Sequence, residues 1–75
     1  MTWNYRIVKA KSDGSKTGEI FYIKEAYYEN KQDPHSLTVN PIYAQGDTLE
    51  ELKEDFRLMN EAFQKPVLKE EKYDN

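Results

Sequence analysis

The chain has 75 residues, with 33% charged and 37% hydrophobic side chains and a formal net charge of -3. This length allows one small domain with a limited core, so six Tyr, three Phe and one Trp have to supply much of the buried area. One His and no Cys exclude a disulfide framework and a thiolate metal site, and the acidic balance makes non-specific nucleic-acid binding an unfavoured function.

The first residues, "MTWNYRIVKA", show neither the apolar run nor the small-residue cleavage pattern of a signal peptide. No apolar run in the chain approaches the roughly 18 residues that a membrane-spanning helix needs. These observations predict a soluble cytoplasmic protein without a membrane partner.

Two strands are predicted at the start of the chain, over residues 3–10 and 19–29. Both alternate with a period of two and are rich in β-branched and aromatic residues. Between them, "KSDGSKTG" is typical of a hairpin loop. The second strand carries rings on both faces, because Phe21 and Tyr27 share one face while Tyr22 and Tyr28 share the other. We assign the Phe21 face to the core, since the opposite face has Lys24 at its centre.

A third strand is predicted over residues 36–45, "SLTVNPIYAQ", after a turn at Asp33-Pro34. Pro41 has no amide hydrogen, so it indicates an edge position or a break in this strand.

A helix of about 16 residues follows. Thr48 is its predicted N-cap and Glu51, three residues on, completes a capping box, while Pro66 ends it. Its large apolar residues, at alternating spacings of three and four, form one stripe: Leu49, Leu52, Phe56, Met59 and Phe63. Val67 and Leu68 leave room for a short fourth strand, and residues 69–75 are predicted to be a disordered charged tail.

The predicted fold is therefore α+β: a three-stranded antiparallel meander with one C-terminal amphipathic helix packed on one face, in β-β-β-α order, as a single domain over residues 1–68. We expect the helix stripe to cover Trp3, Tyr5, Ile7, Phe21 and Ile23. The reverse face of the sheet is left bare. Exposed aromatic residues there favour protein contacts, so the predicted partner or dimer contact consists of Arg6, Tyr22, Lys24 and Tyr28.

No pattern in the sequence indicates catalysis. His35 follows a turn and has no obvious partner, and the acidic helix residues Glu50, Glu51, Glu54 and Asp55 are better explained as a solvated face than as a metal site. We predict no enzymatic activity, no cofactor and no metal. The aromatic and basic residues of the first two strands are of the kinds found in sheets that bind single-stranded nucleic acid. Binding of single-stranded nucleic acid is therefore a second, less favoured alternative.

The segment "IYAQGDTLEELKEDF" resembles HicB-like proteins, in which a strand passes through a polar residue and Gly into a capped helix. The matching residues are Gly46, Asp47, Thr48, Glu50 and Glu51. The β-β-β-α order is also similar to that family's partial RNase-H-like domain. In addition, the chain resembles a group of short bacterial proteins that begin "WNYR" and end near "KPVL".

This resemblance implies an antitoxin-like role, in which the protein binds and neutralises a small toxin ribonuclease as a homodimer or larger homo-oligomer. Typical family members also carry a C-terminal DNA-binding segment; here nine residues follow Pro66, so a short form without DNA binding is expected. The alternative is a phage or regulatory inhibitor or adaptor that docks on a larger protein complex.

Overall fold

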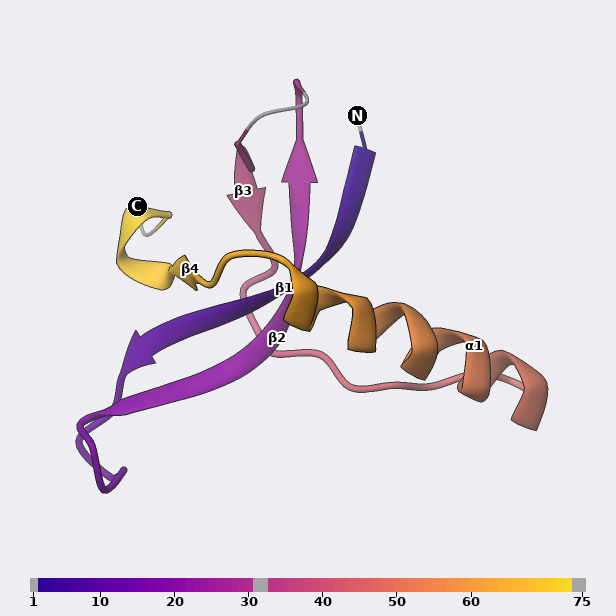
Figure 1. The fold of residues 1–75 in the computed structure, drawn as a ribbon, viewed down its shortest axis with the longest axis horizontal. Coiled ribbons are helices and arrows are strands. Elements are labelled where there is room, and N and C mark those ends of the chain that lie inside the picture. Colours follow the sequence, from indigo (N-terminus) through magenta and orange to yellow (C-terminus); the bar gives the residue numbers. More distant parts are fainter. Residues whose placement is uncertain (1, 31–32, 74–75) are drawn as a thin grey trace.

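A long antiparallel hairpin forms the centre of the fold, and every other element is attached to it (Figure 1). The computed structural model describes residues 2–30 and 33–73. Its elements are β1 (Thr2–Lys11), β2 (Glu19–Tyr28), β3 (Ser36–Leu37), α1 (Leu49–Asn60), the 3-10 turn η1 (Glu61–Gln64), β4 (Leu68–Lys69) and the 3-10 turn η2 (Glu70–Lys72). The four described strands form a curled mixed sheet in the order β3-β2-β1-β4, so the α+β class is confirmed.

The central hairpin follows the sequence prediction within one residue at each strand end. Its register runs without a bulge from Thr2 opposite Tyr28 to Lys11 opposite Glu19. Gly18 closes the loop with a φ of 82°, a left-handed conformation that glycine adopts at no steric cost. Both strands bend together midway, so the two ends of the hairpin point in different directions (Figure 1).

The predicted third strand is much shorter than residues 36–45. Only Ser36 and Leu37 form β3, antiparallel to β2. Beyond them the chain still touches β2 through two backbone bonds of 3.0 Å, from the Thr38 amide to the Glu25 carbonyl and from the Ile42 amide to the Ile23 carbonyl. Pro41 lies between these contacts and cannot donate a ladder bond, which explains why regular pairing does not continue.

The predicted helix is present with its predicted cap. The Thr48 hydroxyl accepts the Glu51 amide at 3.1 Å, and α1 with η1 spans 16 residues before Pro66. On its solvent side Arg57 bridges Glu54 and Glu61. Among residues 2–30 and 33–73, no helix has the length and apolarity needed to cross a membrane.

The expected packing of the helix on the sheet is largely wrong. Of the five large apolar residues predicted to face the sheet, only Met59 is buried, and it joins Tyr5, Ile7 and Ala62 in a small core. The helix meets the sheet at its C-terminal end and projects away from it (Figure 1). The other four of these residues therefore remain accessible, with exposed fractions of 62% for Leu49, 37% for Leu52, 66% for Phe56 and 69% for Phe63. Trp3 and Phe21, predicted to lie under the helix, are about half exposed.

The reverse face of the sheet, expected to be bare, is covered by the chain itself. Val8 and Ala26 on this face have no exposed surface, and Arg6, Lys24 and Tyr28 are buried. The cover is the segment after Pro66. Its β4 pairs in parallel with β1, and η2 brings Glu70 over Lys24. Residues 69–73, which the sequence predicts to be a disordered tail after a domain of residues 1–68, thus lie in β4 and η2 and in the residue that follows η2; residues 74–75 lie outside the described residues.

Candidate interaction surface

An ion pair between buried Lys24 and partly exposed Glu70 fastens the C-terminal segment to the reverse face. Lys24 Nζ lies 2.6 Å from Glu70 Oε1 and also donates to the Val39 carbonyl at 3.1 Å. The Tyr22 hydroxyl donates to the same Glu70 oxygen at 2.6 Å. Hydrogen bonds from Lys24 and then from Tyr22 lower the pKa of Glu70, because both favour its charged form. Tyr22 and Lys24, the two predicted contact residues at the centre of β2, therefore form hydrogen bonds within the chain.

Arg6 is held in a similar way. Its Nη1 donates to the Tyr28 hydroxyl at 2.8 Å, and its Nη2 donates to the Pro66 carbonyl at 2.7 Å. The structure thus gathers all four predicted contact residues on one face, but as an internal network around the C-terminal segment. Their contact with a partner stays a prediction. Since Arg6 and Lys24 are buried, they are also poorly placed to meet the phosphates of a nucleic acid.

A second polar contact fixes how the helix is turned about its axis. The Tyr5 hydroxyl donates to Asp55 Oδ1, and the Gln45 amide donates to Asp55 Oδ2 at 3.1 Å. Burial, and then the bond to Asp55, raise the pKa of Tyr5. Because Asp55 is held against β1 and the incoming loop, the side of the helix that carries Phe56 is turned away from the sheet.

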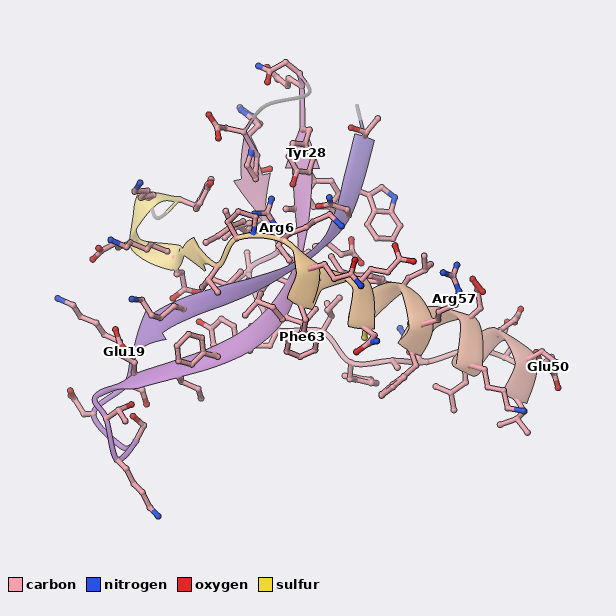
Figure 2. The ribbon with its side chains drawn as sticks, in the orientation of Figure 1. Arg6, Glu19, Tyr28, Glu50, Arg57 and Phe63 are labelled. Atoms are coloured by element: carbon pink, nitrogen blue, oxygen red, sulfur yellow. The ribbon has the colours of Figure 1, made fainter. Side chains whose placement is uncertain are left out.

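The result is an apolar surface that no described part of the chain covers. We call it the apolar stripe: Leu49, Phe56 and Phe63, each about two-thirds exposed. Figure 2 places Phe63 near the hairpin and Glu50, the sequence neighbour of Leu49, at the free end of the helix, so Leu49 and Phe63 lie at opposite ends of it. The three residues are seven apart, a spacing that keeps side chains on nearly one face of a helix. The sequence does not distinguish this exposed face from the buried face of a core helix, because the same residues belong to the amphipathic pattern that predicts packing on the sheet.

Other candidate sites do not assemble. His35 is exposed and lies 3.8 Å from Glu29, and the described residues contain no group of three or more His, Cys, Asp or Glu able to hold a metal ion. The acidic helix residues face different ways: Asp55 bonds Tyr5 and the Gln45 amide, whereas Glu54 pairs with Arg57, which lowers the pKa of Glu54.

An open hollow of about 350 Å³ lies between the hairpin end and the C-terminal segment. Its charged lining alternates in sign and is partly paired, with Lys9 at 3.3 Å from Glu19. This mixture selects neither an anion nor a cation. The apolar stripe is therefore the surface feature with the clearest functional meaning.

Comparisons of the chain with protein-family models, with curated proteins and with solved structures give no match.

Proposed function

We propose that the protein is a non-enzymatic interaction module that binds and neutralises a partner protein, as HicB-like antitoxins do. The observation that carries this proposal is the apolar stripe on a helix that projects from the sheet. Large apolar side chains that lie exposed along one helix favour a protein-contact site, and large rings account for much of the binding energy of protein interfaces.

The energy available on this surface is substantial for so small a protein. Burying a whole Phe side chain is worth roughly 1.5–3 kcal/mol. Phe56 and Phe63 are 66% and 69% exposed, so covering what remains of each would contribute roughly 1–2 kcal/mol. Folding of the isolated chain leaves this energy unused, and contact with a partner would recover it.

The HicB-like version is supported by the local role of the residues that carry the resemblance. Thr48 caps α1. At Gly46 the loop passes so close to the first turn that an added Cβ would lie 2.6 Å from the Leu52 amide nitrogen. These residues set where the helix starts and how the loop approaches it, and so help present the stripe. A toxin-like ribonuclease is the partner that the resemblance implies.

Affinity capture from the native host tests the proposal, with bound proteins identified by mass spectrometry. The wild type and Val39→Glu, a control at an 89% exposed apolar position outside the stripe, are expected to retain the same partner. Phe56→Glu is expected to lose it. Equal capture by Phe56→Glu would place the contact elsewhere.

The captured partner is then purified and assayed for RNA cleavage with and without this protein. Inhibited cleavage supports the antitoxin-like role. A captured partner that is a component of a larger complex and cleaves no RNA would instead favour the inhibitor or adaptor alternative.

A further inference from the structure

We propose that a second copy of this chain covers the apolar stripe, with the two α1 helices packed antiparallel about a two-fold axis at Phe56. This inference rests on the proposed function in one respect: it takes the helix face to be an interaction surface. It adds a second occupant, which competes with the partner protein for the same three side chains, together with the direction of the pair and the residue at its centre.

The stripe is symmetric about Phe56. Leu49 lies seven residues before it and Phe63 seven residues after it. At 1.5 Å per residue Leu49 is about 10 Å away along the helix, and Phe63 is slightly farther because it lies in the 3-10 turn η1, which has a longer rise. Seven residues make about two full turns, so the three side chains stay on nearly the same side of the helix. When two such helices run antiparallel, Phe56 meets Phe56 of the second copy and Leu49 meets Phe63. The same patch is then used twice, as a two-fold interface requires.

The charge distribution favours the antiparallel direction. Before Phe56 the helix carries four acids and one base, namely Glu50, Glu51, Lys53, Glu54 and Asp55. After Phe56, up to Pro66, the chain carries two bases and one acid, namely Arg57, Glu61 and Lys65, and Arg57 already pairs with Glu54 and Glu61 of its own chain. An antiparallel pair sets the acidic half of each helix beside the less acidic half of the other, whereas a parallel pair would stack the two acidic halves. The helix dipoles are also favourably opposed in the antiparallel pair.

The area of the stripe is smaller than that of a standard interface. At two-thirds exposure each Phe ring offers roughly 100–170 Å², so with Leu49 the stripe presents on the order of 300–400 Å² per copy. A standard interface takes about 800 Å² from each partner, so the flanking exposed residues Lys53 and Asn60 have to join the contact, and the dimer is expected to be weak and reversible. The helix projects from the sheet, which leaves its outer side open to a second copy (Figure 1).

Sedimentation equilibrium tests the pairing over a wide range of protein concentration. The wild type and Val39→Glu are expected to approach twice the chain mass of 8.9 kDa as concentration rises. Phe56→Glu, which sets two carboxylates against each other on the axis, is expected to stay at 8.9 kDa with an unchanged circular dichroism spectrum. A wild type that stays monomeric, or a Phe56→Glu variant that dimerises equally well, would overturn the proposal.

Disulfide trapping tests the direction, because the chain contains no cysteine of its own. Leu49→Cys and Phe63→Cys change exposed positions and should leave the fold intact. Mixing the two variants under mild oxidation is expected to give mainly the mixed cross-link between them. Cross-links formed mainly within each variant alone would indicate parallel helices and refute the antiparallel pair, as would the absence of any cross-link.

The two proposals fail in distinguishable ways. If Phe56→Glu is monomeric but still captures the host partner, the dimer stands and the stripe is not the partner's site. If the wild type is monomeric and Phe56→Glu loses the partner, the proposed function stands and the second copy does not occupy the stripe.

Discussion

Replacing Glu70 by glutamine removes the negative charge that faces the buried ammonium of Lys24. The two groups are 2.6 Å apart, and the Lys24 side chain is only 5% exposed. Leaving one member of a buried ion pair without its partner costs about 3–5 kcal/mol. The loss should be smaller here because the Glu70 side chain is 24% exposed, and because the glutamine oxygen can still accept a hydrogen bond. We expect Glu70→Gln to lower the free energy of unfolding by about 2 kcal/mol.

Urea unfolding followed by circular dichroism at neutral pH measures this loss. A domain of this size has a free energy of unfolding of roughly 4–11 kcal/mol, so the change is easily resolved. Glu71→Gln, at the exposed neighbouring position, is the matched control and should change the free energy little. A double variant with Lys24→Met should recover part of the loss, since the unpaired charge is then gone. Equal effects of Glu70→Gln and Glu71→Gln would refute the role assigned to this ion pair.

The stabilisation that the Lys24–Glu70 ion pair provides depends on pH, and the pKa shift of Glu70 sets the direction of this dependence. The pKa of Glu70 is lowered in the folded chain, chiefly by the hydrogen bond from Lys24 and then by that from Tyr22. The folded state therefore releases this proton more readily than the unfolded state, and the stabilisation is present above the ordinary carboxyl pKa of 4.5. It is lost as pH falls below that value and through the lowered pKa. The difference between the wild type and Glu70→Gln should shrink over that acidic range, and a difference that stays constant there would contradict the assignment.

Three further substitutions test the helix and its anchor. Thr48→Ala removes the N-cap hydroxyl and should cost about 1 kcal/mol in urea unfolding, with Thr48→Ser as the conservative control. Gly46→Ala forces a methyl group toward the Leu52 amide nitrogen and should cost about 1–3 kcal/mol in the same assay; a neutral result would mean that the loop can shift. Tyr5→Phe removes the hydroxyl bonded to Asp55 and should cost about 2 kcal/mol. Because the pKa of Tyr5 is raised above 10.0, this contribution should hold below that pH and fade above it, and the ultraviolet absorbance titration of the variant should lack one late-ionising phenol.

Local chemistry explains why the hairpin and the helix were predictable. Alternation over β1 and β2 with a polar, glycine-containing loop between them predicts a hairpin, and the structure has it. Thr48 and Pro66 mark the helix ends through the backbone groups that they satisfy or lack. The third strand was overestimated because the apolar residues after Pro41 suit a strand, although Ile42 and Ala44 instead pack against the core from an irregular segment.

The choice between the two faces of the sheet was not predictable in the same way. β2 has aromatic residues on both faces, so its two-residue alternation does not indicate which face is covered. Lys24 suggested solvent on one face, but a lysine can be buried, at a desolvation cost, when a carboxylate from a distant segment pairs with it, as Glu70 does. The pairing of Glu70 with Lys24 could not be predicted from the charged sequence after Leu68, because only the tertiary contact distinguishes Glu70 from the neighbouring acids.

The sequence alone determined the α+β class, the central hairpin, the start of the helix and its stop before Pro66, because each depends on residues close together in the chain. The tertiary structure alone decided which residues each face meets. Pairs such as Lys24 with Glu70 and Tyr5 with Asp55 are about fifty residues apart, and no local pattern encodes them. Through those pairs the C-terminal segment covers one side of the sheet, and the helix is turned so that Leu49, Phe56 and Phe63 face outward.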